Sequence, residues 1–277
     1  PPNCVADVWD KDTWLLWVED LHERIARLDD PRIIVPTGNY ALYALTGKGK
    51  VPWHSKDGKS SRPGILAWRG SILSYRDRRG RILKVLPTPH PAATFPGRDP
   101  GLEPICKRDW HRIAVESQSK EVDLPIRTHL ISPSMSDLEF LVKICEAATD
   151  TDVLVMDIEN PREKDGSAPI VCVGFSLTSD LSVTIPTVKS YWGKQLDAVW
   201  ETIRYLCSLP VHKGAWNNFH EQYWMWAERE IVIENLWWDG LYMHHVLDPS
   251  APHSLAFCAS VDTREPYWKD EAKDPDE

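Results

Sequence analysis

Charge is divided very unequally along this chain, and this division indicates two separate domains. Residues 1–118 contain 19 Lys and Arg against 14 Asp and Glu, whereas the rest contain 13 against 27. The net charge is therefore +5 in the first part and −14 in the second. Two parts of opposite net charge indicate different functions. A chain of 277 residues is also long enough for two domains, each with its own hydrophobic core. We expect domains over 1–118 and 135–277, joined by a linker over 119–134.

The composition is that of a soluble globular protein. Hydrophobic residues make up 42% of the chain, and no stretch approaches the roughly 18–20 apolar residues of a membrane-spanning helix. The first residues lack the basic and apolar regions of a signal peptide, so we expect a cytoplasmic protein. The six cysteines include no Cys-x-x-Cys pair, which argues against a zinc knuckle or a disulfide framework.

The first domain has the alternating helices and strands of an α/β fold. Apolar residues recur at helical spacing over 14–28, and a β-rich run at 32–36 follows. Residues 37–47 predict a turn, a short helix and a glycine stop. A hairpin is predicted over 69–84, and its second strand ends just before His90. Ligands of α/β sheets gather at the carboxyl ends of strands, which makes His90 a candidate site residue.

The predicted hairpin concentrates positive charge, because residues 69–84 include six basic residues and one acid. Cations that neutralise backbone phosphates supply most of the sequence-independent affinity for DNA, so the hairpin is a candidate DNA contact. The alternative is an ordinary solvated hairpin tip. The candidate DNA-binding residues here are Arg69, Arg76, Arg78, Arg79 and Arg81.

Four segments of the first domain resemble the uracil-DNA glycosylase superfamily. They are Pro-Pro-Asn at 1–3, Ile-Val-Pro-Thr-Gly-Asn-Tyr-Ala-Leu at 34–42, Trp-Arg-Gly-Ser at 68–71 and Leu-Pro-Thr-Pro-His-Pro-Ala at 86–92. The resemblance implies a partial parallel-sheet domain in which His90 meets a flipped base and stabilises negative charge as the glycosidic bond breaks. The family's glycine-rich motif normally lies before the Pro-Pro-Asn segment. We therefore expect this domain to bind DNA without excising uracil.

Two carboxylates stand together in the second domain. Asp157 and Glu159 end the apolar run at 152–159, and a strand places residues two apart on the same face. Like charges repel there unless a cation relieves them, and oxygen ligands favour Mg²⁺ or Mn²⁺. The alternative is an exposed strand end with two solvated acids.

An aromatic-rich helix at 216–228 supplies a second motif. Asn217 and Glu221 lie four apart and share one predicted helical face. Together with the acidic strand and the segments 237–261 and 266–271, this motif resembles the proofreading 3′-to-5′ exonuclease domain of phage-type family A DNA polymerases. The match covers residues 125–277.

The exonuclease resemblance implies an RNase H-like (DnaQ-like) mixed sheet with flanking helices. It also implies two-metal hydrolysis of a frayed 3′ end with Mg²⁺ or Mn²⁺. Asp157, Glu159 and Glu221 would be the catalytic metal ligands, and Asn217 would contact DNA. The implied partners are single-stranded 3′ ends, primer–template DNA and a polymerase domain or subunit. If the chain is phage-encoded, its expected location is the host cytoplasm.

Two positions depart from the exonuclease pattern. Glu221 stands where an Asp is usual and is one methylene longer. The third motif, a Tyr followed four residues later by a metal-binding Asp, normally lies beyond the segment 266–271. Two alternatives therefore stay open beside the exonuclease. One is a noncatalytic DNA-binding or assembly subunit of a replication complex, and the other, less favoured, is a uracil-DNA glycosylase.

Overall fold

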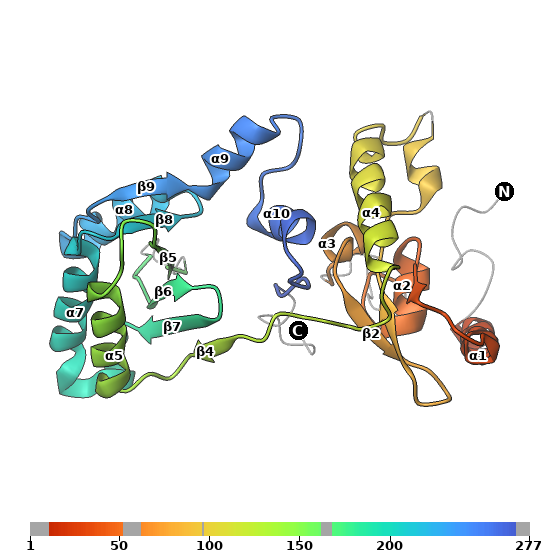
Figure 1. The fold of residues 1–277 in the computed structure, drawn as a ribbon, viewed down its shortest axis with the longest axis horizontal. Coiled ribbons are helices and arrows are strands. Elements are labelled where there is room, and N and C mark those ends of the chain that lie inside the picture. Colours follow the sequence, from red (N-terminus) through yellow and green to blue (C-terminus); the bar gives the residue numbers. More distant parts are fainter. Residues whose placement is uncertain (1–10, 52–61, 96, 162–167, 270–277) are drawn as a thin grey trace. The chain divides into compact units, whose positions relative to one another are not determined.

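The computed structural model describes residues 11–51, 62–95, 97–161 and 168–269 (Figure 1). The chain forms two units, of which the first comprises Pro1–Leu124 and Ser254–Glu277 and the second Pro125–His253. The predicted boundaries put residues 254–277 in the exonuclease domain, whereas these residues group with the first unit. The Pro-Pro-Asn segment at 1–3 and the end of the segment 266–271 lie outside the described residues.

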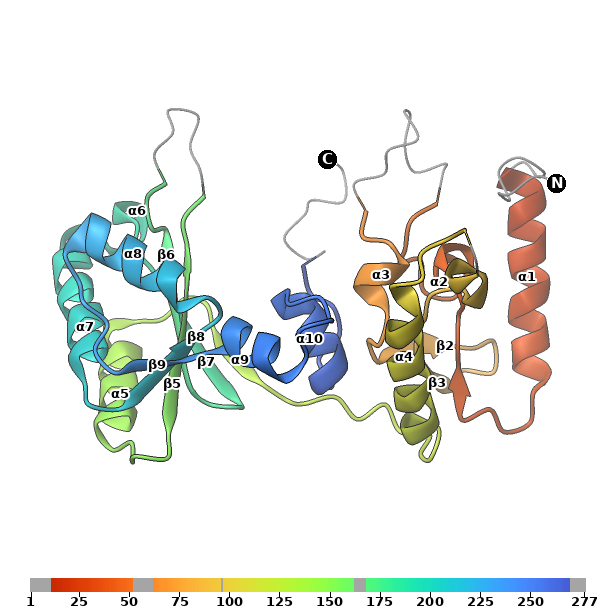
Figure 2. The same ribbon diagram turned by 90° about the horizontal axis from the view of Figure 1, so that it is seen from above.

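A three-stranded sheet organises the first unit. Its order is β1 (Ile33–Ile34), β3 (Ile82–Val85), β2 (Leu73–Arg76), with β1 parallel and β2 antiparallel to β3. The β2–β3 pair is the predicted hairpin. The described helices of this unit are α1 (Lys11–Arg27), α2 (Asn39–Thr46), α3 (Ile65–Trp68), the 3-10 helix η3 (Pro91–Thr94), α4 (Leu102–Glu116) and α10 (Leu255–Asp262) (Figure 2).

Apolar side chains cover both faces of this sheet. On one face, Ile25 of α1 and Leu42 of α2 pack in a cluster with strand residues. On the other face, Leu86 packs with Ile113 of α4. The predicted glycine stop is confirmed, because Gly47 ends α2 with a left-handed φ of 67°.

A six-stranded mixed sheet organises the second unit. Its strands are β4 (Thr128–Leu130), β5 (Val153–Glu159), β6 (Cys172–Thr178), β7 (Leu181–Pro186), β8 (His212–Ala215) and β9 (Leu236–Asp239). The order is β4-β7-β6-β5-β8-β9, in which β6 runs antiparallel to β5 and β7 while the other pairs are parallel. This mixed α/β architecture, a mixed sheet with flanking helices, agrees with the predicted fold class.

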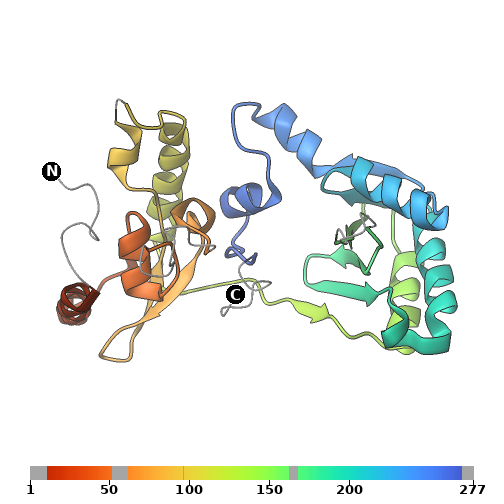
Figure 3. The same cartoon turned by 180° about the vertical axis from the view of Figure 1, so that it is seen from behind.

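The second unit also contains helices, several of which contribute buried residues to the core on one face of that sheet. They are α5 (Met135–Glu146), α6 (Lys189–Trp192), the 3-10 helix η4 (Gly193–Gln195), α7 (Leu196–Ser208), α8 (Asn218–Arg229) and α9 (Gly240–Leu247). α5 and α7 lie side by side (Figures 1 and 3), and their buried residues share one core with Met225 of α8. Ser134 begins α5 through a capping box with Asp137. None of the described helices has the length and apolar character that crossing a bilayer needs.

Candidate active site

Asp157 and Glu159 lie on the open face of β5, which is the strand between β6 and β8. The alternate residues Leu154, Met156 and Ile158 are buried in the core, whereas both acids are exposed. The predicted sharing of one face is therefore confirmed, and it follows from the two-residue repeat of a strand.

The neighbouring strand leaves room beside this acidic pair. In the β5–β6 ladder Gly174 lies opposite Asp157, and Cys172 lies opposite Glu159. A Cβ atom added at Gly174 would meet the backbone oxygen of Asp157 at 3.7 Å, an ordinary contact, and nothing else within 4 Å. The surface next to Asp157 is therefore open to a small ligand.

Glu221 brings a third carboxylate to the same region from the first turn of α8. It is 1% exposed, and its Oε2 atom has no hydrogen-bond partner among the described residues. Burial raises the pKa of Glu221 to about 7, and the negative charges of Asp157 and Asp239 add to the increase. A buried carboxylate facing other carboxylates is an electrostatic arrangement that a cation relieves.

Asp239 is a structural acid. Its carboxylate accepts hydrogen bonds from the backbone N–H groups of Asn217 (3.3 Å), Asn218 (2.8 Å), Leu241 (3.0 Å) and Tyr242 (3.1 Å). It thereby caps α9 and fastens the turn between β8 and α8 to the start of that helix. The carboxylate that fixes the position of α8 thus comes from outside the helix.

Asn217 differs from its predicted position. It precedes α8 with a left-handed φ of 75°, a conformation that Asn adopts more readily than most residues. The helix begins one residue later, so Asn217 is its N-cap residue and does not extend the helical face that carries Glu221. Within the helix, the His220 ring reaches Asn160 beyond the end of β5, with Nε2 and Oδ1 3.2 Å apart.

The described residues include no group of three or more His, Cys, Asp and Glu side chains that could enclose one metal ion. Asp157 on β5 and Glu221 on α8 therefore interact electrostatically, but the acids of β5 and α8 do not enclose a metal site. The histidines of α9 do not form such a set either. His253 contacts His244 through Nδ1 at 2.8 Å and His245 through Nε2 at 2.9 Å, so the contacts lie on opposite sides of its ring.

The five predicted DNA-binding arginines do not form one exposed strip. Arg69 is 2% exposed and makes a buried ion pair with Asp109, so its guanidinium is not available to a phosphate. Arg81 donates hydrogen bonds to the Asp77 carboxylate at 2.7 Å and to the backbone oxygens of Leu28 and Asp29 at 2.9 Å each. These bonds fasten the hairpin to the residues that follow α1. Charge alone could not distinguish these buried roles from surface ones.

The remaining three arginines lie at the hairpin surface. Arg78 forms an ion pair with Glu19 of α1 and lies 3.9 Å from Glu23. Arg76 and Arg79 are exposed, and Arg76 donates to the backbone oxygen of Gly80 at 3.2 Å. The positive surface of the hairpin is therefore smaller than predicted.

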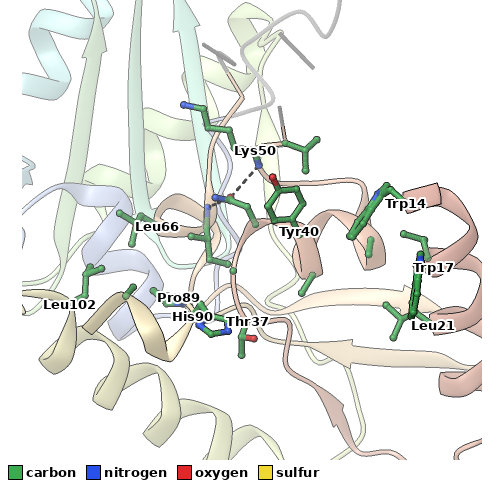
Figure 4. A pocket seen from close by; sticks show the side chains of 18 of the residues that line it. Trp14, Trp17, Leu21, Thr37, Tyr40, Lys50, Leu66, Pro89, His90 and Leu102 are labelled. Carbon is green, nitrogen blue, oxygen red and sulfur yellow. Dashed lines mark hydrogen bonds between the residues drawn. The ribbon is translucent and has the colours of Figure 1, made fainter. Parts of the chain in front are cut away.

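His90 lies at the edge of a large pocket in the first unit (Figure 4). It is exposed, and its Nδ1 accepts a hydrogen bond from the backbone N–H of Ala92 at 3.1 Å. The pocket has a volume of about 1120 Å³ and is bounded by α1, α2 and the loop that leads into η3. Its described lining has no acid and includes the aromatic residues Trp14, Trp17 and Tyr40 and the basic residues Lys50, His90 and Arg98.

The sequence did not reveal that α1 contributes to this pocket. Trp14 and Trp17 both belong to the helically spaced apolar residues over 14–28, and Trp14 is buried at 9% exposure. Trp17, however, is 54% exposed and faces the pocket. One signal could have identified Trp17 as a pocket residue. It is a second tryptophan on a helix face that already has enough apolar residues for packing.

Comparisons with known proteins find only distant structural likenesses. No protein-family model matches this chain, and no curated protein matches it. Among solved structures, the EXD2 exonuclease domain is 13% identical, with a TM-score of 0.34, over 48% of this chain and 68% of that one. The Aedes aegypti Nibbler EXO domain is 13% identical, with a TM-score of 0.37, over 52% and 72%. The catalytic core of RRP6 from Trypanosoma brucei is 15% identical, with a TM-score of 0.36, over 72% and 50%.

Proposed function

We propose that the second unit is a metal-dependent nuclease that removes nucleotides from single-stranded 3′ ends. The observation that carries this proposal is the pair Asp157 and Glu159 on the open face of β5, together with the buried carboxylate of Glu221, whose Oε2 atom has no partner among the described residues and whose pKa the charge of Asp157 raises. A soluble protein has little reason to keep a buried carboxylate among other acids unless a cation binds there. The sequence resemblance to proofreading exonucleases supports the same chemistry.

Asp157, Glu159 and Glu221 would hold Mg²⁺ or Mn²⁺. The donors are all hard oxygens, which these ions prefer, and Mg²⁺ commonly uses only one or two carboxylates together with water and substrate phosphate. A closed set of three side chains is therefore not required. When bound, such ions generate a nucleophile from water near neutral pH and stabilise the phosphodiester oxygens.

The chain's own residues would set up this site electrostatically. Asp157 and Glu159 present negative charge to the solvent side, while Glu221 adds charge from a position that water does not reach. Asp239 positions α8, and hence Glu221, through its four backbone hydrogen bonds. Asn217 lies at the start of the same helix and is our proposed contact to the nucleic acid.

We further propose the context of a phage-type family A DNA polymerase, in the cytoplasm of its host. Primer–template DNA would be the substrate, and a polymerase domain or subunit the partner. The first unit would be the uracil-DNA glycosylase-like module, with functional boundaries near 1–118, 119–134 and 135–277. These assignments rest on the sequence resemblance.

A second candidate is noncatalytic binding of nucleic acid by the first unit. The pocket at His90 favours it, because aromatic rings stack on unpaired bases and its cations suit phosphates. Lys50 and Arg98, with no acid in the part of the lining that the structure describes, give the pocket the sign of charge that nucleic acid requires. Excision of uracil by this chain remains the less favoured alternative.

The proposed function is tested with a single-stranded oligonucleotide labelled at its 5′ end. The full chain should shorten it progressively from the 3′ end with Mg²⁺ or Mn²⁺, releasing mononucleotides, and should stop when the metal is chelated. Binding without metal-dependent shortening would contradict the nuclease and favour the second candidate.

The exposed arginines of the hairpin should contribute salt-dependent affinity for DNA. Changing Arg76 and Arg79 together to Gln removes two cations that face the solvent. Each lost phosphate contact lowers the slope of log K against log salt by about 0.7 on a single strand, so we expect a decrease of up to about 1.4. The matched control is Arg78→Gln, because Arg78 is already paired with Glu19. Equal slopes for wild type and the double variant would make the hairpin an ordinary solvated one.

A further inference from the structure

Residues 254–268, the C-terminal strap, lie far along the chain from the rest of the first unit and yet belong to it. The chain leaves the first unit after Leu124 and returns at Ser254. The strap consists of α10 and the extended residues that follow it. Three sets of contacts join the strap to the earlier part of this unit.

The first set centres on Ser260, a buried residue of α10. Arg69 donates to its Oγ atom at 2.9 Å while it also pairs with Asp109. Arg112 donates to the backbone oxygen of Ser260 at 2.5 Å. Two arginines of the earlier segment thus bind one residue of the strap, and breaking a buried charged network of this kind is costly.

The second contact requires a glycine. Gly70 has a left-handed φ of 71°, and a Cβ atom added there would lie 2.7 Å from the backbone oxygen of Ser260. Real Cβ atoms do not approach backbone oxygens so closely, so any larger residue would push the strap away. The segment around Gly70 is shaped to receive α10.

The third set fixes the extended part of the strap. Arg264 pairs with Glu116 at 3.0 Å and donates to the backbone oxygen of Asp123 at 2.9 Å. The backbone N–H of Tyr267 donates to the Ser71 hydroxyl at 3.0 Å. The ring of Tyr267 also packs edge-on against Trp68, with ring centroids 5.2 Å apart.

We propose that the strap is an integral part of the first unit, so that the second unit is an insertion attached at both of its ends. The covalent connection near residue 125 is then one of two links between the units, and the docked strap is the other. This second link keeps the β2–β3 hairpin and the acidic face of β5 in one particle when the first link is cut. It raises the effective concentration of each unit for the other.

The test is a nick in the full chain. A protease recognition site is inserted between Pro125 and Ile126, where Ile126 is 92% exposed and lies outside the strap contacts. After complete cleavage, size-exclusion chromatography without denaturant should show a single particle with the mass of the uncut protein. Separation into two fragments, from protein that was folded before cleavage, would overturn the proposal.

Two variants with a matched control locate the link. Gly70→Ala should weaken the association of the nicked fragments at least tenfold, and Arg264→Gln should weaken it without changing the segment around Gly70. Gly80→Ala is the control, because Gly80 also has a left-handed φ, of 80°, but its added Cβ would meet nothing within 4 Å. If both test variants left the association unchanged, the strap would not be the link.

Discussion

Replacing Asp157 with Asn should lower metal-dependent release of nucleotides at least about 100-fold, a loss of roughly 2.7 kcal/mol of transition-state stabilisation. The side chains have nearly the same shape, so the substitution removes charge without opening a gap in the sheet. Asp157 is exposed on the face that carries Glu159, and its charge also reaches buried Glu221. The substitution therefore removes the acid that shares a face with Glu159 and interacts electrostatically with Glu221.

The matched control for this prediction is Asp150→Asn. Asp150 is an exposed acid in the turn just before β5, so this variant changes the net charge equally without touching the acidic face. The initial rate of mononucleotide release is measured for all three proteins with Mg²⁺ and with Mn²⁺. A rate for Asp157→Asn within a few-fold of the control would mean that Asp157 is not at the reacting centre.

Replacing Glu221 with Gln should stabilise the protein at alkaline pH. Burial, together with the charges of Asp157 and Asp239, raises the pKa of Glu221 to about 7, whereas an unfolded Glu titrates near its ordinary value of about 4.3. Between these values the folded state binds more protons than the unfolded state. Wild-type stability therefore falls as pH rises through this window. Gln cannot ionise, so its advantage should reach roughly 2–3 kcal/mol at pH 8 and stay below about 1 kcal/mol at pH 5.

Urea unfolding of the two proteins at pH 5 and pH 8, without divalent metal, measures this difference. Glu139→Gln is the control, because Glu139 is an exposed acid on α5 and its neutralisation should have little effect at either pH. An equal difference between Glu221→Gln and wild type at both pH values would show that Glu221 is not held at a raised pKa. Saturating Mn²⁺ should stabilise wild type more than the variant at pH 8, since the cation offsets the same repulsion.

Local patterns in the sequence were sufficient to predict the acidic face. The two-residue repeat of a strand places Asp157 and Glu159 together whatever surrounds them, and the structure confirms it. The hairpin also follows from neighbouring residues, and it is confirmed. These features depend on residues close in the chain.

Features that depend on distant partners could not be predicted. Arg69 belongs to a basic run, but its role is set by Asp109 and Ser260, which lie 40 and 191 residues away. The strap likewise resembles part of an exonuclease in sequence, yet its contacts are with the first unit. Glu221 was predicted as a metal ligand, but its burial depends on how Asp239 anchors the start of α8.

The most direct test of the central claim, that the acids of β5 bind a divalent cation, is a calorimetric titration with Mn²⁺. It uses the full chain without nucleic acid, because the chain with Mn²⁺ should shorten an oligonucleotide and the heat of hydrolysis would obscure the binding. We expect saturable binding by wild type and by Asp150→Asn, and none by Asp157→Asn. Unchanged binding by Asp157→Asn, or no binding by wild type, would contradict the metal site and the nuclease built on it.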